Sequence, residues 1–233
     1  MKISVCVDAL FAGQDFIESM GAISSIGIEA YEFWAWWDKD LNALIKAQNE
    51  NGLTPAACCT RFISLVDEAL RRDYIQGLEA SIQAAKKLGC KTLISQVGDD
   101  LGHSRYSQRK SLIAGLKGCV PLLEAEDIQL VFEPLNTFVD HAGYFLTRSD
   151  EAFEIADAVG SPNVKVLFDI YHQQIMEGNL INRITENIDL IGHFHAAGNP
   201  GRHELYTGEI NYREVFRAID ETGYGGFVGF EYF

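Results

Sequence analysis

A strict alternation of short apolar runs with longer amphipathic runs constrains the fold of this chain more than any other feature. The short runs, rich in β-branched and aromatic residues, predict eight strands over residues 2–9, 28–35, 53–59, 91–97, 128–134, 164–170, 190–196 and 227–233. The amphipathic runs between them predict seven helices over residues 15–27, 40–52, 72–89, 108–127, 149–160, 179–189 and 211–223. Alternation of this kind indicates a parallel sheet whose strands are joined by crossover helices.

The number and character of the strands favour a closed sheet. Eight near-continuous apolar strands, none of which has the marks of an edge strand, predict an α/β fold of the (β/α)8 TIM barrel type. A doubly wound open sheet is the alternative, but the chain reads DALFAGQDF after the first strand and lacks the glycine-rich turn that such a sheet would carry there. No linker or repeat interrupts residues 1–233, which are therefore predicted to form a single domain.

The last predicted strand has no helix after it. The sequence stops two residues after Glu231, so the barrel is predicted to lack its final helix. Such a barrel would expose apolar surface between its last and first strands. This predicts that a neighbouring copy covers the surface in a homo-oligomer, and the alternative is that the given chain is shorter than the ancestral form.

Charge and cysteine content narrow the class of protein. The net charge of −14 disfavours nucleic acid as a partner, because an acidic surface repels phosphate backbones. The N-terminus has no signal-peptide pattern, and no run is long enough for a membrane span. The five cysteines are an odd number and form no C-x-x-C motif. We therefore expect a cytoplasmic protein with reduced thiols and a small-molecule partner.

A polar residue that can bind metal follows the apolar run of each of the last four strands. These residues are Glu133 in VFEPLN, Asp169 in LFDIYH, His195 in GHFHAAG and Glu231 in VGFEYF. The carboxyl ends of neighbouring barrel strands meet at one face, so the four side chains are predicted to converge. Three carboxylates and one imidazole suit Mn²⁺ or Mg²⁺, with Co²⁺ or Zn²⁺ as alternatives. The competing interpretation is four separate polar residues, each satisfied at its own strand end. His193, on the same strand face as His195, is predicted to be a core or supporting residue.

Motifs in the second half of the chain resemble those of a known family. FEPLN, FDIYHQQ, HFHAAGNPGRHE, TGEINY and GFEY are similar to the motifs of the hydroxypyruvate isomerase family, in the xylose-isomerase-like barrel superfamily. The resemblance covers the whole chain, and its specific motifs lie in residues 131–231. It implies that Glu133 and Glu231 both bind the metal and form the acid–base pair, and that Asp169 and His195 complete the coordination.

The resemblance also implies a reaction. An intramolecular oxidoreductase would isomerise hydroxypyruvate and tartronate semialdehyde, or a similar short 2-oxo acid, through a cis-enediolate. His172 and Arg202 would hold the substrate's oxygens, and Arg202 would grip its carboxylate in a bidentate manner. The alternative for Arg202 is a solvent-exposed loop arginine. The alternative for His172 is a partner for a ligand carboxylate.

Other side chains near the strand ends are candidates for the pocket. Glu32 and Gln96, near the ends of the second and fourth strands, are predicted to reach the substrate, with Trp34 as an apolar wall. His103 and His141 are predicted to be surface loop histidines.

Rival functions use the same barrel. Ketose 3-epimerases of the superfamily commonly place an acid six residues after the first glutamate, where this chain has Val139, although Asp140 follows directly. An abasic-site endonuclease would need further histidines where the third and fourth strands end in Cys58, Cys59 and Gln96. A catalytically idle metal-binding or scaffold barrel is the last alternative.

Overall fold

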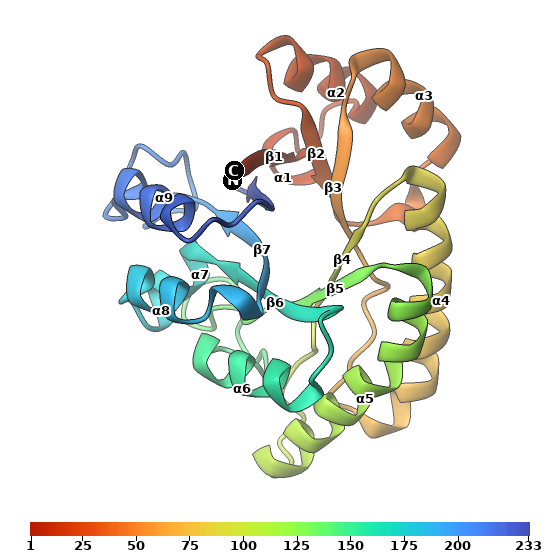
Figure 1. Cartoon of the computed structure of the whole chain (residues 1–233), viewed down its shortest axis with the longest axis vertical. Coiled ribbons are helices and arrows are strands. Elements are labelled where there is room, and N and C mark those ends of the chain that lie inside the picture. The colour runs from red at the N-terminus through yellow and green to blue at the C-terminus, as the bar shows by residue number, and fades with distance from the viewer.

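The protein folds into a closed barrel of eight parallel strands. A computed structural model describes residues 1–233, with the strands arranged around the barrel in chain order from β1 to β8 (Figure 1). The strands are β1 (Lys2–Cys6), β2 (Ala30–Phe33), β3 (Thr54–Cys59), β4 (Thr92–Ser95), β5 (Gln129–Phe132), β6 (Val164–Asp169), β7 (Ile191–Ala196) and β8 (Phe227–Phe230). The predicted TIM barrel is confirmed, and the open sheet is excluded because β8 pairs with β1.

Helices surround the barrel on its outer face (Figure 1). They are α1 (Val7–Leu10), α2 (Phe16–Ser25), α3 (Leu41–Asn51), α4 (Arg71–Leu88), α5 (Arg105–Glu126), α6 (Ser149–Val159), α7 (Ile170–Met176), α8 (Leu180–Glu186) and α9 (Tyr212–Glu221). Three short 3₁₀ turns, η1 (Trp36–Asp38), η2 (Glu68–Leu70) and η3 (Ile188–Leu190), join these elements. Each predicted helix is present, but the absence of a final helix, the single domain and the homo-oligomer stay predictions.

Two strands continue directly into short helices that the sequence pattern does not predict. β1 ends at Cys6 and continues directly into α1, while β6 ends at Asp169 and continues directly into α7. The side chain of Asp169 accepts a hydrogen bond from the backbone N–H of His172, which caps the first turn of α7. Apolar periodicity misses such short helices because the apolar run of the strand continues into them.

Apolar side chains fill both sides of the barrel wall. Most of the core lies between strands and helices, where Phe153 and Phe168 stack at 6.3 Å between ring centroids. A separate apolar cluster, formed by alternate residues of four strands, lies inside the barrel and comprises Ala57, Cys59, Ile94, Val131 and Leu167. This cluster takes up the β3–β6 side of the interior, and the opposite side carries polar residues.

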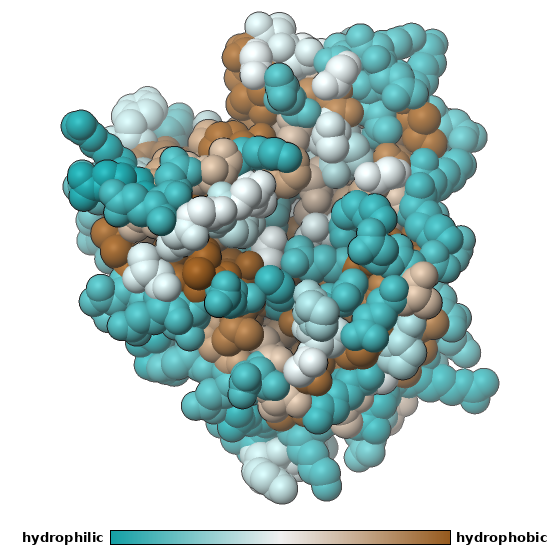
Figure 2. Space-filling model, in the orientation of Figure 1, coloured by the Kyte–Doolittle hydropathy of each residue, from teal (hydrophilic) through white to brown (hydrophobic).

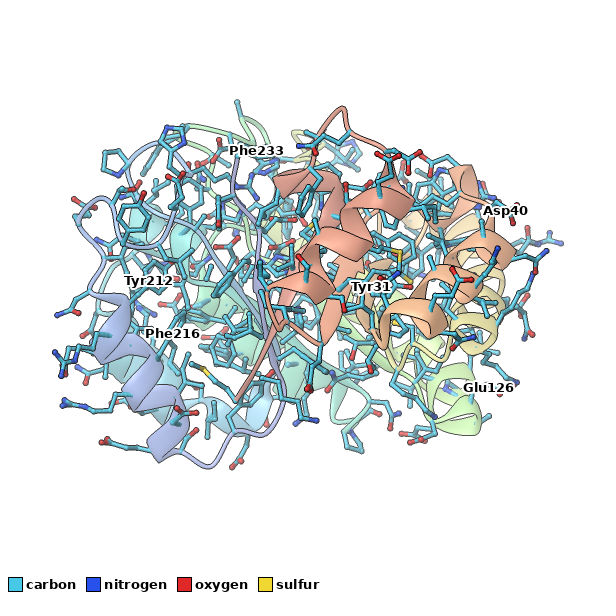
Figure 3. All side chains as sticks on the ribbon, turned by 90° about the horizontal axis from the view of Figure 1, so that it is seen from above. Tyr31, Asp40, Glu126, Tyr212, Phe216 and Phe233 are labelled. Atoms are coloured by element: carbon cyan, nitrogen blue, oxygen red, sulfur yellow. The ribbon has the colours of Figure 1, made fainter.

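The surface is mostly hydrophilic. In Figure 2, hydrophilic side chains cover the outer edge of the molecule, and hydrophobic ones show mainly in recesses toward its middle. None of the helices combines the length and the apolar character that a membrane crossing requires. The side view in Figure 3 places Phe233, just after β8, at one end of the barrel, and Glu126, the last residue of α5, toward the other.

One buried tyrosine joins the ends of two neighbouring strands. The hydroxyl of Tyr144 accepts a hydrogen bond from the backbone N–H of Val97 (2.7 Å) and donates one to the backbone carbonyl of Glu133 (3.0 Å). Tyr144 is 7% exposed, so water cannot readily replace these bonds. The loop that carries Tyr144 is thereby fixed across the end of the barrel.

We predict that Tyr144→Phe lowers the free energy of unfolding by about 1–3 kcal/mol, because it leaves a buried N–H without a partner. Urea unfolding measures the change. Tyr106→Phe is the matched control, since Tyr106 is 78% exposed and should change stability little. Equal effects of the two substitutions would contradict this role of Tyr144.

Candidate active site

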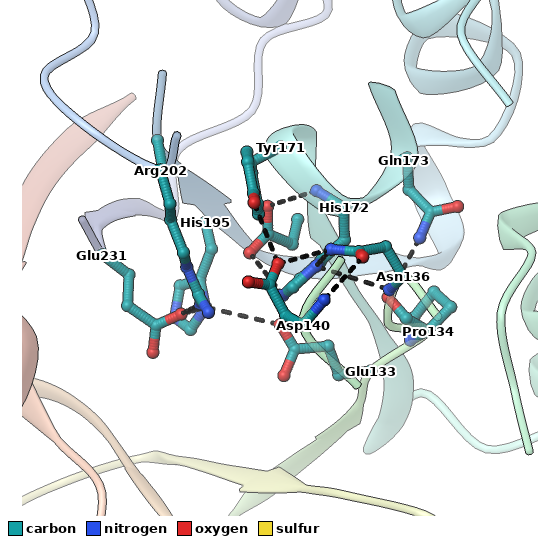
Figure 4. Close-up of polar contacts among 12 residues, drawn as sticks. Glu133, Pro134, Asn136, Asp140, Tyr171, His172, Gln173, His195, Arg202 and Glu231 are labelled. Atoms are coloured by element: carbon teal, nitrogen blue, oxygen red, sulfur yellow. Dashed lines mark hydrogen bonds and ion pairs between the residues drawn. The ribbon is translucent and has the colours of Figure 1, made fainter. Parts of the chain in front are cut away.

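Four strand ends bring the predicted metal ligands together. Glu133 directly follows β5, Asp169 ends β6, His195 lies near the end of β7, and Glu231 directly follows β8. Asp169 and His195 are paired in register across β6 and β7. His195 Nδ1 lies 3.5 Å from Glu133 Oε1 and 3.5 Å from Glu231 Oε2 (Figure 4). The four side chains are buried.

The geometry of this group fits a cation. Glu133 Oε1, Asp169 Oδ2 and His195 Nδ1 are buried atoms without a hydrogen-bond partner. Ligand atoms of Asp169, His195 and Glu231 lie within 4.8 Å of one another, as do those of Glu133, Asp169 and His172. Buried carboxylates without partners are costly, and a divalent cation would satisfy these oxygens. Glu133, Asp169 and His195 are therefore not separately satisfied, whereas Glu231 has Arg202 and Trp34 as partners. The role of the four residues as ligands stays a prediction.

The pKa directions reflect the crowding of negative charge. Burial raises the pKa of Glu133 to about 7, and neighbouring Glu231 and Asp169 add to this rise while His195 opposes it. Burial alone would lower the pKa of His195, but Glu231 and Glu32 raise it well above its usual value. Both directions indicate a surplus of negative charge at the strand ends.

A cavity of about 630 Å³ opens above this group. Four of the five predicted substrate-binding residues line it, together with the two glutamates predicted to be catalytic: Trp34, Gln96, Glu133, His172, Arg202 and Glu231. Apolar side chains, including Phe62, Ile63 and Leu135, form part of its wall. The cavity is large enough for a small organic acid or a sugar.

Arg202 reaches the cavity from the loop after β7. Its backbone φ is 55°, and its guanidinium forms an ion pair with Glu231 (Figure 4). The guanidinium also lies over the ring of Tyr171, 5.5 Å from the centroid. With its side chain 13% exposed, Arg202 is not the solvent-exposed loop arginine of the alternative interpretation.

His172 is held by a buried amide. Asn136 Nδ2 lies 2.7 Å from His172 Nδ1 and 2.7 Å from Asp140 Oδ2, which also accepts a hydrogen bond from the hydroxyl of Tyr171 (Figure 4). Because the amide donates to Nδ1, the ring proton of a neutral His172 lies on Nε2. That atom lies 3.5 Å from Asp169 Oδ2 and has no hydrogen-bond partner. It is available as a donor.

Trp34 and Gln96 lie in the cavity wall in different ways. Trp34 is more than an apolar surface, because its indole N–H donates to Glu231 Oε1 at 2.7 Å. Gln96 Nε2 lies 3.9 Å from Cys59 Sγ, and its Oε1 has no partner. The Gln96 amide therefore has an acceptor free for a bound molecule.

Glu32 does not line the cavity, and this differs from the predicted contact with substrate. Its side chain is buried in the barrel interior, with Oε2 2.8 Å from His193 Nε2 and Oε1 3.0 Å from His195 Nε2. Burial would raise the pKa of Glu32, but His193 and His195 lower it below its usual range. Glu32 shares its strand face with Trp34, which lines the cavity, but it lies two residues earlier along β2 and therefore deeper in the barrel interior. His193 is buried, in agreement with the prediction of a core or supporting residue.

His141 lines the cavity, whereas the sequence predicts that it is a surface loop histidine. It is half-buried and lines the cavity, with its ring centroid 5.2 Å from that of His172. The loop after β5 folds back, and the backbone N–H of His141 bonds the carbonyl of Asn136. A loop that folds back in this way produces no periodic pattern in the sequence. His103 is exposed, as predicted.

Comparisons with known proteins agree with this fold. A model of the family described as xylose isomerase-like TIM barrel matches residues 20–233. Hydroxypyruvate isomerase of Escherichia coli K12 is 35% identical, with 100% of this chain and 93% of that protein covered. The 2-oxo-tetronate isomerase of Cupriavidus necator is 44% identical, with 93% of this chain and 86% of that protein covered. A crystal structure described as an AP endonuclease of family 2 from Brucella melitensis has a TM-score of 0.95 at 26% identity, and covers 100% of this chain and 93% of that one. The chain therefore belongs to the hydroxypyruvate isomerase and 2-oxo-tetronate isomerase family, within the xylose isomerase-like TIM barrels.

Proposed function

We propose that this protein is a metal-dependent isomerase that interconverts hydroxypyruvate and tartronate semialdehyde, or acts on a similar short 2-oxo acid, through a cis-enediolate. The observation that carries the proposal is the convergence of Glu133 and Glu231, which line a cavity, on the buried side chain of His195. Glu133 and His195 carry buried atoms without hydrogen-bond partners. The identity to relatives described as hydroxypyruvate and 2-oxo-tetronate isomerases supports the same reaction class.

The two glutamates are suited to proton transfer. Glu133 and Glu231 both line the cavity, and each lies 3.5 Å from the same nitrogen of His195. A substrate in the cavity would therefore meet one carboxylate at each of two neighbouring carbons. One glutamate takes the α-proton, the other delivers a proton to the adjacent carbon, and the roles exchange in the reverse direction.

Glu133, Asp169, His195 and Glu231 would hold the cation. When bound, Mn²⁺ or Mg²⁺ supplies Lewis-acid polarisation of the substrate carbonyl.

Two further groups are suited to holding the substrate's oxygens. Arg202 presents a guanidinium in the cavity wall, and His172 presents an Nε2–H without a partner. A planar guanidinium binds carboxylates well, so Arg202 would bind the acid group of a 2-oxo acid. In the absence of substrate the guanidinium pairs with Glu231, so a bound carboxylate would compete for it and release Glu231 for catalysis.

The rival functions receive less support. Val139 is 68% exposed, and Asp140 is engaged by Asn136 and Tyr171, so neither supplies the cavity acid of a ketose 3-epimerase. The wall near β3 and β4 offers Cys59 and Gln96 rather than the histidines of an abasic-site endonuclease. The net charge of −14 also opposes binding of a nucleic acid.

Solvent deuterium incorporation tests the reaction. The protein is incubated in D₂O with Mg²⁺ and either hydroxypyruvate or a panel of ketoses, and NMR follows loss of the α-proton signal and formation of product. We expect exchange with hydroxypyruvate that stops when a chelator is added. Exchange only at C3 of a ketose would support the epimerase instead. If none of the compounds offered showed exchange, the isomerase proposal would be refuted.

Glu133→Gln is predicted to lower the exchange rate by about 10²–10⁴-fold, because the amide cannot accept the proton. Circular dichroism and thermal unfolding verify that the variant folds. Glu204→Gln, at an exposed loop position, is the matched control and should keep wild-type exchange. Near-normal turnover by Glu133→Gln would contradict the two-glutamate mechanism.

Metal removal should lower stability. At a free Mn²⁺ concentration a hundred times Kd, binding stabilises the folded protein by about 2.7 kcal/mol, and EDTA should abolish the rise in Tm. Asp169→Asn keeps the oxygen that caps α7 but loses the charge, so we expect it to remove most of the Mn²⁺-dependent shift. The control is Asp157→Asn on the exposed side of α6. An unchanged shift in Asp169→Asn would exclude Asp169 as a ligand.

A further inference from the structure

The interior of the barrel is divided into an apolar side and a polar side. Strands β3 to β6 contribute the apolar cluster that contains Cys59, Val131 and Leu167. The polar side is formed from β7, β8, β1 and β2, and we name its members the interior polar group: Ser4, Glu32, His193, His195 and Gly229. Ser4, Glu32 and the two histidines are at most 2% exposed. Burying a carboxylate and two imidazoles is costly, and an apolar filling would serve packing better.

The carboxylate of Glu32 crosses the barrel interior to reach β7. It starts on β2 and has to pass β1 and β8, where Ser4 and Gly229 are paired in register. A Cβ atom on Gly229 would lie 1.9 Å from Glu32 Oε1, so only glycine leaves room for the carboxylate. Gly229 is also paired in register with His195 on β7. The lack of a side chain at Gly229 of β8 therefore permits the contact between Glu32 and β7.

The two oxygens of Glu32 have different partners. Oε2 accepts a hydrogen bond from the hydroxyl of Ser4 (3.1 Å) and lies 2.8 Å from His193 Nε2. Oε1 has no hydrogen bond and lies 3.0 Å from His195 Nε2, which also has none. The two atoms are within hydrogen-bonding distance of each other but are not aligned for a hydrogen bond. Ser4 and His193 therefore anchor the carboxylate, and one oxygen remains for His195.

The other ring nitrogen of His195 faces the candidate metal site. Nδ1 lies 3.5 Å from both Glu133 Oε1 and Glu231 Oε2. An imidazole that binds a metal through one nitrogen commonly donates its other N–H to a carboxylate, which fixes the tautomer and strengthens the ligand. Glu32 lies where such a carboxylate would be.

We infer that Glu32 is the positioning residue of the metal centre. With a cation bound, Glu32 Oε1 would accept the Nε2–H of His195, so that the Nδ1 lone pair faces the cation, while Ser4 and His193 hold Glu32 in place. Glu32 acts through His195 and does not touch the substrate, which accounts for its absence from the cavity lining. The inference rests on the proposed metal dependence but makes no use of the identity of the substrate.

Mn²⁺ affinity is the first test. Electron paramagnetic resonance measures the concentration of free Mn²⁺ while metal-free wild type and metal-free Glu32→Gln are titrated with Mn²⁺. No substrate is present. We expect Kd to rise about 10–100-fold, the range for loss of the outer partner of a metal-binding histidine. The matched control is Ser95→Ala, which removes the buried hydrogen bond between Ser95 of β4 and Tyr74 of α4 and should leave the Kd for Mn²⁺ unchanged.

Unchanged Mn²⁺ affinity in Glu32→Gln would overturn the inference, as would a wild type that binds no Mn²⁺. Equal weakening in Ser95→Ala and Glu32→Gln would also overturn it, since the loss would then reflect general loosening of the barrel.

The tautomer of His195 is the second test, and it needs no variant that could fail to fold. In ¹⁵N-labelled wild-type protein with bound Mg²⁺, long-range ¹H–¹⁵N spectra should show His195 protonated at Nε2 and unprotonated at Nδ1. A proton on Nδ1 would overturn the inference. Neither test measures turnover, so the two proposals can fail separately. If the wild type had no isomerase activity but Glu32→Gln still weakened Mn²⁺ binding, the proposed function would be refuted and the role of Glu32 would be supported.

Discussion

Three carboxylates are buried together at the carboxyl ends of β5, β6 and β8, and their negative charge has to be neutralised. Glu133, Asp169 and Glu231 are at most 6% exposed, and two of them carry an oxygen without any hydrogen bond. Arg202 pairs with Glu231, but one guanidinium cannot balance three carboxylates. A divalent cation at this place makes the burial of the carboxylates physically reasonable, and the same charge is what enediolate chemistry requires.

Closure of the sheet is what brings these residues to one point. Because β8 pairs with β1, the last strands bend around the interior, and residues nearly a hundred positions apart in the sequence become neighbours. The interior polar group, on the side of the barrel formed by β7, β8, β1 and β2, is joined to the site through His195. The apolar β3–β6 side supplies rigid packing. One half of the barrel interior therefore stabilises the fold, and the other half supports the site.

Much of this arrangement could be predicted from the sequence, because it follows from periodicity. Alternation predicts the barrel, and the position of a polar residue after each apolar run predicts that Glu133, Asp169 and His195 converge. The placement of Glu32 could not be predicted, because it depends on the small residues of β1 and β8 that let it cross the interior. His141 was missed for a related reason: it reaches the cavity only because the loop after β5 folds back.

The claim that three carboxylates and one imidazole bind a single cation can be tested most directly by anomalous diffraction from crystals soaked in Mn²⁺. The account predicts one anomalous peak at the carboxyl ends of β5 to β8, coordinated by oxygens of Glu133, Asp169 and Glu231 and by Nδ1 of His195 rather than Nε2. No peak there, or a peak held by other residues, would contradict the account.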